Sequence, residues 1–338
     1  MSILYSFDKK SSTKPVQFRV NKVSSFTYKE QEFTFNEINA PRLKEDVLQS
    51  IAPGRSIALA STTEKTDYPD FNEILMALYR NADTSLKKTF RDSVIVASRG
   101  ALSRVAAAST TKHRELLLQC CYYKKILFIT RKGSAVYVKN ARQSEKAGQS
   151  FEALLLDRTT EVELGALKMY INCEVDGIDR NGGQIELKSK HNGLSDSKTW
   201  EQCSAEWFMQ AKLAATQKII VGDRRSSNIA NINILRVEEL HNNSTAYIRN
   251  QRKAKNGAKI TPWKENYVLR HLLNFLLELL NEAQERPAEV LTVCKAEGSN
   301  DFVIERADND LRTMFTDEFL EAVSKEDVNP VQSDCEKV

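Results

Sequence analysis

The chain has 338 residues, of which 41% are hydrophobic and 28% charged, and its formal net charge is +4. This composition is ordinary for a soluble globular protein, and the length allows one large domain or two. The charge is too small to indicate nucleic-acid binding by itself. The six cysteines show no Cys-x-x-Cys spacing, which argues against a zinc site or a secreted disulfide framework. No run of about twenty apolar residues predicts a membrane span, and the first apolar run is too short for a signal peptide, so we expect an intracellular protein without a membrane partner.

The first 140 residues predict peripheral strands, a capped helix and a meander. Asp70 is a suitable N-cap, and Phe71, Ile74, Leu75 and Leu78 follow it at helical spacing. Lysine pairs and a Lys-Gly step mark the turns between apolar runs farther on. In chain order we predict one or two strands within 1–40, a helix over 42–51, a helix over 70–80, a strand over 92–98 that ends at Arg99-Gly100, and strands over 116–122, 126–130 and 135–138.

The second part of the chain predicts alternating helices and strands, and therefore a mixed sheet with helices packed on it. Asn181-Gly182-Gly183 has the residues of a tight hairpin turn. The predicted elements are a helix that starts near 148, strands over 169–178 and 184–188, a helix over 199–215, strands over 218–222 and 232–237, an exposed basic loop over 249–264, a core helix over 267–280, a strand over 302–305, a helix over 316–323 and a charged, loose tail over 324–338.

The predicted hairpin concentrates charge. Because side chains alternate along a strand, Glu174 and Asp176 share one face, as do Glu186 and Lys188. If the two strands pair, three carboxylates and one ammonium converge, and a hard divalent cation would relieve the repulsion among the acids. We therefore expect that neutralising these acids leaves the fold nearly intact. The alternative is an exposed sheet face with cross-strand ion pairs, which the tripeptides alone do not exclude.

Two further residues extend this constellation. Glu152 lies near the start of the helix before the hairpin, and Gln210 lies in the middle of the helix after it. An acid on a helix, a Glu-x-Asp strand, a Glu-x-Lys strand and a second helix resemble the core of the PD-(D/E)xK nucleases. Phosphodiester hydrolysis needs an activated water and a cation beside the developing phosphorane charge, and several acids can hold one or two such ions.

A more specific resemblance, over about residues 17–323, is to the decapping exoribonuclease (DXO) family, with its fungal relatives that partner the nuclear 5′–3′ exoribonuclease. The motifs occur in the family's order. They are Arg99-Gly100 after a strand, Gly148-Gln-Ser-Phe-Glu152, Glu174-Val-Asp176, Glu186-Leu-Lys188, Trp207-Phe-Met-Gln210 followed by Gly222-Asp-Arg224, and Phe319-Leu-Glu-Ala322. Departures such as Ser98, where the family has tryptophan, fall beside the expected 5′-end pocket and remove no expected metal ligand.

The resemblance implies a role for each site residue. Glu152, Glu174, Asp176 and Glu186 would be catalytic acids that hold one or two Mg²⁺ or Mn²⁺ ions, together with the carbonyl of Leu187. The remaining members would bind the RNA: Lys188 and Gln210 would hold the scissile phosphate and the water, and Arg99 would bind a phosphate of the 5′ end. A forked, permanently charged guanidinium suits that task.

The implied fold is mixed α/β, with a PD-(D/E)xK-like core and two β-sheets flanked by helices around a central cleft, in a single domain over 1–323. The implied function is metal-dependent hydrolysis at RNA 5′ ends: removal of incomplete or non-canonical caps, NAD caps included, with 5′–3′ exonuclease activity in some members, as part of mRNA quality control in the nucleus or cytoplasm. The partner would be RNA, and a 5′–3′ exoribonuclease is a candidate protein partner of an otherwise monomeric chain. Two alternatives remain open: a DNA nuclease on the same core, and a non-catalytic or dual-role partner that stabilises a processive exoribonuclease.

Overall fold

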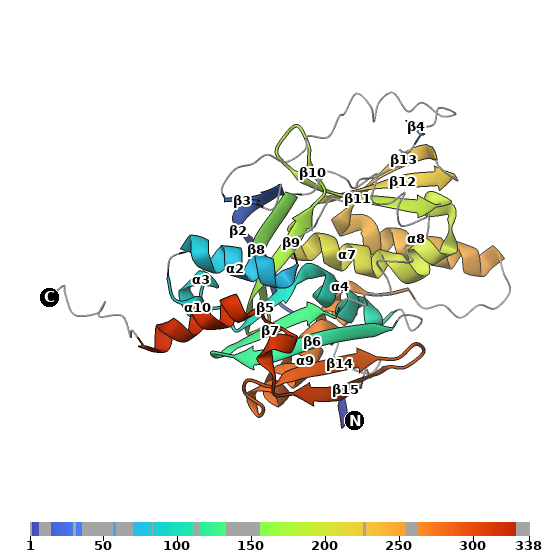
Figure 1. The fold of residues 1–338 in the computed structure, drawn as a ribbon. Coiled ribbons are helices and arrows are strands. Elements are labelled where there is room, and N and C mark those ends of the chain that lie inside the picture. Colours follow the sequence, from blue (N-terminus) through green and yellow to red (C-terminus); the bar gives the residue numbers. More distant parts are fainter. Residues whose placement is uncertain are drawn as a thin grey trace.

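The fold is taken from a computed structural model of the chain (Figure 1). It describes residues 2–6, 15–29, 32–35, 57–58, 70–82, 84–110, 115–132, 156–225, 228–254 and 262–328. The helices predicted over 42–51 and from 148, and the strand predicted over 135–138, lie outside these residues.

The larger of two sheets has ten described strands, in the spatial order β1-β15-β14-β6-β7-β5-β9-β8-β2-β3. Neighbouring strands are antiparallel except around β5, which runs parallel to both β7 and β9. The strands are β1 (Ser2–Ser6), β2 (Phe18–Lys29), β3 (Glu32–Phe35), β5 (Ile95–Ser98), β6 (Leu116–Tyr123), β7 (Ile126–Arg131), β8 (Leu156–Leu164), β9 (Leu167–Val175), β14 (Val290–Lys295) and β15 (Asp301–Asp308).

The smaller sheet has five described strands, in the order β10-β11-β12-β13-β4. Its central pair, β11 and β12, is parallel, and the other pairs are antiparallel. The strands are β4 (Ile57–Ala58), β10 (Gly177–Ile178), β11 (Gln184–His191), β12 (Lys218–Arg225) and β13 (Asn228–Arg236). With two mixed sheets and flanking helices, the structure confirms the predicted fold class.

Helices cover both faces of the large sheet (Figure 1). On one face, α4, α7 and α9 pack into a core that also takes residues from the small sheet, and on the other face α2, α3 and α10 form a second core. Strand β5 contributes to both cores: Ile95 and Ala97 enter the first and Val96 enters the second, which is why these three successive residues are all apolar. The described helices are α2 (Phe71–Ala82), α3 (Leu86–Thr89), α4 (Arg99–Ala108), a π-helical turn (Thr199–Cys203) that leads into α7 (Ser204–Leu213), α8 (Leu240–Ala254), α9 (Glu265–Gln284) and α10 (Asp317–Val328).

Local sequence signals account for several of these elements. Oδ1 of Asp70 accepts hydrogen bonds from the backbone N–H groups of Asn72 and Glu73, while a carboxylate oxygen of Glu73 accepts from the N–H of Asp70. This reciprocal arrangement is a capping box, and it confirms the predicted start of α2. Lys124 and Lys125 both adopt positive φ angles, 51° and 65°, which are those of a tight turn between β6 and β7.

Three expectations need correction. The basic segment predicted as a loop over 249–264 is helical up to Ala254, where α8 ends, and α10 continues through the start of the predicted tail to Val328. The sequence interpretation also missed α4, although Ala101, Leu102 and Val105 follow Arg99 at helical spacing and are fully buried. None of the helices described here is both long enough and apolar enough to cross a bilayer.

Candidate active site

Glu186 is the centre of the candidate site. It lies in β11 and has no exposed surface. Nη1 of Arg99 donates a hydrogen bond to its Oε2, and Nζ of Lys188 donates one to its Oε1, both at 2.6 Å. The side chains of Arg99 and Lys188 are only 7% and 16% exposed. At the centre of the site, the buried carboxylate of Glu186 is therefore held between two largely buried cations.

The two cations reach Glu186 by different routes. Lys188 stands two residues farther along the same strand, so both side chains lie on one face of β11. Arg99 is the first residue of α4 and directly follows β5, a strand of the larger sheet. The contact between Arg99 and Glu186 thus joins the two sheets across 87 residues of sequence.

The surroundings of Glu186 keep its carboxyl group ionised. Burial by itself would raise the pKa of Glu186, but the charges of Arg99 and Lys188, and the hydrogen bonds that they donate, hold it below its ordinary value. A carboxylate must be deprotonated to bind a metal ion. Glu186 is in that state at neutral pH.

Asp176 places a second carboxylate beside β11, the strand of Glu186. It follows the end of β9, where the chain leaves the large sheet, and it is 5% exposed. Its Oδ2 accepts a hydrogen bond of 2.6 Å from the backbone N–H of Leu187, the residue next to Glu186. Asp176 and Glu186, ten residues apart in sequence, are therefore neighbours at β11.

The predicted pairing of the Glu174 and Glu186 strands is wrong. Strand β9, which carries Glu174, pairs with β8 and β5 in the large sheet, and only Gly177 and Ile178 pair with β11. The chain changes sheets at Asp176 because β9 already has a neighbour on each side, whereas β11 takes β12 as its parallel partner. The hairpin is thus shorter than predicted: β10 and β11 form it within the smaller sheet, and Asp176 lies at the step from β9 to β10 that joins the two sheets.

The remaining predicted residues are placed less completely. Gln210 lies on α7, which packs against α4, the helix that begins with Arg99. Its buried side-chain oxygen has no hydrogen-bond partner within the described structure. Glu152 lies outside the described residues. For Glu174, the structure describes the backbone, opposite Asp157 of β8, but not the side chain. The roles of all these residues stay predictions.

The hairpin turn contains a buried acid that the sequence interpretation did not use. Asp179 is 7% exposed, and its Oδ1 accepts hydrogen bonds from the N–H groups of Asn181 and Gly183, at 3.0 and 2.7 Å. Its Oδ2 accepts one from Nζ of Lys218 at 2.7 Å. The bond from Lys218 is the main cause that holds the pKa of Asp179 below its ordinary value. An Asp two residues before an Asn-Gly step is the signal that could have revealed this turn.

The described residues of the site offer the oxygen donors that a hard divalent cation prefers. Asp176 and Glu186 are carboxylates, and Gln210 offers an amide oxygen without a partner in the described structure. Oxygen donors of this type are those that Mg²⁺ and Mn²⁺ prefer. Among the side chains that the structure describes, no three histidines, cysteines or acids come together closely enough to hold a metal. A complete site would need Glu152 or Glu174, whose side chains are not among them.

This arrangement of two mixed sheets and intervening helices is the fold of the decapping exoribonuclease (DXO) family. Three solved structures illustrate the likeness. Rai1 from Candida albicans, in complex with pU5-Mn²⁺, is 14% identical, aligns over 96% of this chain and 100% of that one, and has a TM-score of 0.70. Rai1 from Scheffersomyces stipitis, in complex with (3′-NADP)⁺ and a calcium ion, is 16% identical over 95% and 97% of the two chains, with a TM-score of 0.70. Dxo1 from K. lactis, in complex with manganese, is 18% identical over 91% and 95%, with a TM-score of 0.64.

The comparisons with sequences add nothing to this likeness. No protein-family model matches the chain, and the search of curated proteins returns no match. At 13–18% identity the likeness to the solved structures establishes the fold, and the function must be argued from the residues of the site.

Proposed function

We propose that this chain is a divalent-metal-dependent hydrolase that acts on RNA 5′ ends. The observation that supports this most is the fully buried, ionised Glu186 between Arg99 and Lys188, with Asp176 bound to the next residue of the same strand. Buried ion clusters seldom contribute much stability, because desolvation of the charges offsets their attraction, so a functional reason is the better explanation. Proteins of the same fold were crystallised with pU5-Mn²⁺, calcium or manganese.

The acids and the carbonyl on β11 would hold one or two Mg²⁺ or Mn²⁺ ions. The proposed ligands are the side chains of Glu152, Glu174, Asp176 and Glu186, and the carbonyl of Leu187. When bound, such an ion supplies charge opposite the phosphoryl oxygens and makes a water molecule acidic near neutral pH. The lowered pKa of Glu186 keeps the site ready to accept a cation without first losing a proton.

Arg99 and Lys188 would act on the RNA phosphates. In the structure both cations neutralise Glu186. A phosphate that enters the site offers them a second anionic partner, and a guanidinium can bind two phosphate oxygens at once. We infer that Arg99 turns toward a phosphate of the 5′ end and that Lys188 and Gln210 position the scissile phosphate and the water. This exchange of partners would leave Glu186 available to the metal.

The finer proposal concerns the substrate. Removal of incomplete and non-canonical caps, NAD caps included, with 5′–3′ exonuclease activity, fits a site that combines acids with phosphate-binding cations. It also fits the binding of a 3′-NADP molecule by Rai1 from S. stipitis. We extend the proposal to mRNA 5′-end quality control in the nucleus or cytoplasm, by a single-domain monomer.

The same geometry gives one argument for a non-catalytic partner of an exoribonuclease. Because Arg99 and Lys188 already neutralise Glu186, this carboxylate does not need a metal ion to balance its charge. In a protein that had lost catalysis and kept its fold, Glu186 would stay paired with Arg99 and Lys188 at all times. The two functions differ in whether a metal binds at Glu186.

One experiment separates them. Short RNAs that carry a 5′-triphosphate, an unmethylated cap, an NAD cap or a 5′-monophosphate are incubated with the protein and Mg²⁺ or Mn²⁺, and the melting temperature is titrated with Mn²⁺ in parallel. We expect hydrolysis of at least one RNA and a rise in melting temperature by mass action. Glu186→Gln should lose both, with turnover lower by about a thousandfold, since metal ligation contributes several kcal/mol. Glu163→Gln, on the exposed part of β8, is the matched control and should lose neither. Equal Mn²⁺ shifts in all three proteins would contradict the proposed site.

A further inference from the structure

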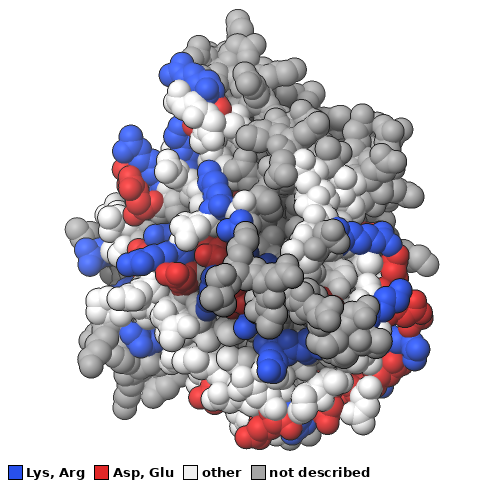
Figure 2. Space-filling model, turned by 90° about the vertical axis from the view of Figure 1, so that its left-hand side faces the viewer, with Lys and Arg blue, Asp and Glu red and all other residues white. Residues whose placement is uncertain are grey.

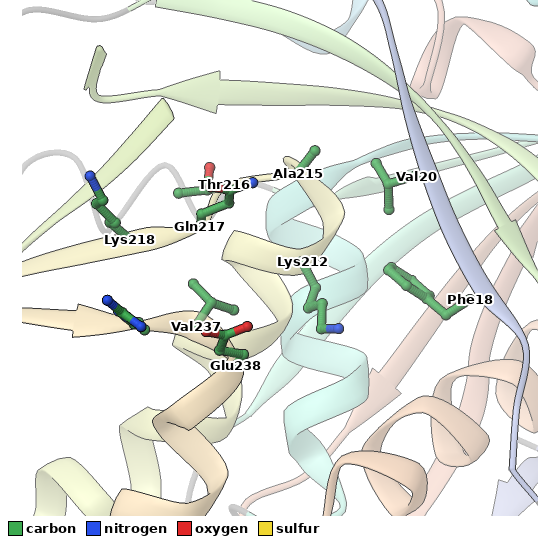
Figure 3. Close-up of a pocket in the computed structure, with 10 residues that line it drawn as sticks. Phe18, Val20, Lys212, Ala215, Thr216, Gln217, Lys218, Val237 and Glu238 are labelled. Carbon is green, nitrogen blue, oxygen red and sulfur yellow. The ribbon is translucent and has the colours of Figure 1, made fainter. Parts of the chain in front are cut away.

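We infer that the chain has a second anion site, distinct from the Glu186 cluster, that takes a nucleoside phosphate. It is a pocket of about 600 Å³ at the end of α7, bounded by β2 and by the adjoining ends of β12 and β13. Figure 3 shows Lys218 on one side, Phe18 and Val20 of β2 on the other, and Lys212 of α7 between them. None of its lining residues is one of the candidate active-site residues.

The residues that line the pocket carry more positive than negative charge, and each of the cations also contacts a carboxylate outside the lining. Three cations line it, Lys212, Lys218 and Arg236, against one carboxylate, Glu238. On the face of the molecule shown in Figure 2, basic and acidic side chains occur in small mixed groups, in keeping with a net charge of only +4. A cluster of three cations in one pocket is therefore a local feature, and such a cluster favours an anionic ligand.

The three cations are held with unequal strength. Lys218 contacts Asp179 at 2.7 Å and Lys212 contacts Glu265 at 3.1 Å, whereas Arg236 lies 3.9 Å from Glu239. The Arg236 side chain is 67% exposed, and an exposed ion pair at that distance contributes little. Arg236 can thus turn to a phosphate at almost no cost, which makes it the first residue to test.

The opposite side of the pocket is apolar. Phe18 and Val20 of β2 line it, while Val237 lies across the pocket beside Glu238 (Figure 3), and Nζ of Lys212 lies 5.9 Å from the ring centroid of Phe18. A pocket of this volume accommodates a molecule of nucleotide size. An aromatic ring beside a cation suits a flat base joined to a phosphate, since bases stack on aromatic side chains while phosphates bind lysine and arginine.

The end of α7 is compatible with an anion. The last carbonyl groups of a helix normally repel negative charge. Here the carbonyls of Gln210, Ala211 and Lys212 accept hydrogen bonds from the following turn, in which Ala215 has a φ of 54°. Thr216, which lines the pocket and is 5% exposed, has a hydroxyl oxygen without a hydrogen-bond partner among the described residues. A ligand would give this polar group a partner that the described residues do not supply.

The nucleoside phosphate could come from two sources, a free nucleotide or a nucleotide within an RNA chain. Lys218 stands opposite Ile185 in the parallel β11–β12 pair, one residue before Glu186. The pocket thus begins beside the strand that carries the candidate active site. The RNA source rests on the proposed function, whereas the free nucleotide does not.

The test is calorimetric binding of AMP and of inorganic phosphate to the full chain without divalent metal, so that it does not depend on hydrolysis. We expect Arg236→Glu to weaken binding of both probes about tenfold, the cost of one charge-assisted contact to a phosphate. Phe18→Ala should weaken binding of AMP and not of phosphate. Arg19→Glu is the matched control: this exposed arginine also lies 3.9 Å from a glutamate, Glu163, and does not line the pocket. It should change neither affinity.

One further variant and two RNA substrates complete the test. Arg99→Ala should leave AMP binding intact if the pocket is separate from the Glu186 cluster. Equal losses in Arg236→Glu and Arg19→Glu, or AMP binding that depends on Arg99 and not on Arg236, would overturn the inference. If Arg236→Glu raises the KM for a 20-nucleotide RNA but not for a dinucleotide, the nucleotide belongs to the RNA chain. If RNA length makes no difference while AMP binding is lost, the ligand is a free nucleotide.

Discussion

Two buried carboxylates lie on the same short hairpin, and they differ in what neutralises them. Asp179, in the turn, accepts hydrogen bonds from two backbone N–H groups of that turn and from Lys218. Glu186, in β11, accepts its bonds from the side chains of Arg99 and Lys188. Both have a pKa below the ordinary value, although burial opposes the shift in each case.

The difference separates a structural acid from an exchangeable one. The backbone N–H groups that bind Asp179 cannot leave without unfolding the turn, so this acid fixes the shape of the hairpin. In the proposed mechanism, the side chains that bind Glu186 rotate toward a phosphate, which would let this acid accept a new partner. A low pKa by itself therefore does not identify a catalytic acid. A better criterion is whether backbone N–H groups bind the acid in addition to side chains, as they do for Asp179.

The largest expected effect comes from removing the Glu186 charge. Glu186→Gln should lower the free energy of unfolding by about 3–5 kcal/mol, because the largely buried cations Arg99 and Lys188 lose one of their partners, the Glu186 carboxylate. This reverses the expectation from the sequence that neutralising the acids would leave the fold intact. Urea unfolding measures it, and Glu186→Gln combined with Arg99→Met should recover part of the loss. An unchanged unfolding midpoint for the single variant would show that Arg99 and Lys188 are neutralised elsewhere.

The second largest effect, a loss of activity, is expected from removing Arg99, the cation that is proposed to turn toward the phosphate. Arg99→Ala should lower kcat/KM on a 5′-labelled RNA by about ten- to a hundredfold, the value of one charge-assisted hydrogen bond to a phosphate. Arg99→Lys should recover activity only in part, because an ammonium cannot reproduce the guanidinium fork. The Mn²⁺-dependent rise in melting temperature should persist in both. If that rise disappears together with activity, Arg99 supports the cleft and does not bind substrate.

A smaller effect is expected in the turn. Asp179→Ala leaves the N–H groups of Asn181 and Gly183 without this acceptor, and should cost about 1–3 kcal/mol of unfolding free energy. Activity per folded molecule should fall much less than in Glu186→Gln, which urea unfolding and turnover on the same preparation will show. A loss of activity as large as that of Glu186→Gln would mean that the two acids do not differ in the proposed way.

Acid titration should show that both acids contribute to stability. A carboxyl whose pKa is lowered on folding contributes stability above its unfolded pKa, and this stability is lost as the pH falls through the folded pKa. The ordinary values are 4.5 for Glu186 and 3.8 for Asp179. The melting temperature of the wild type should thus be steady above about pH 5 and fall below it. Glu186→Gln and Asp179→Asn should each show a shallower fall, and a slope identical to that of the wild type would contradict the pKa assignment.

The smallest effect is expected from removing the charge of Lys218, the exposed partner of Asp179. Lys218 is 42% exposed in its side chain, so Lys218→Met should cost less than about 1 kcal/mol of stability. Thermal unfolding measures this change, and Lys87→Met, in another exposed ion pair, serves as the reference. A cost as large as that of Asp179→Ala would show that Lys218, and not the backbone of the turn, holds the acid.

The sequence by itself determined the local features of this protein. Asp70 and Glu73 specify the start of α2 through a capping box, and Lys124-Lys125 specifies a tight turn. The spacing of Glu186 and Lys188 places both on one face of a strand, and their contact follows. These features involve residues within a few positions of one another, so the chain needs no distant partner to form them. The order of the motifs also implied the fold that the solved structures show.

Only the tertiary structure decided which strands become neighbours and which charges meet. The sequence interpretation paired the strands of Glu174 and Glu186 because they are consecutive, but they lie in different sheets. Arg99 reaches Glu186 across 87 residues, and no local pattern predicts that contact. Strand partners are chosen by how the whole chain buries its apolar faces, as β5 does on both sides. For the same reason, the balance of charge around a buried acid follows from packing and cannot be read from its sequence neighbours.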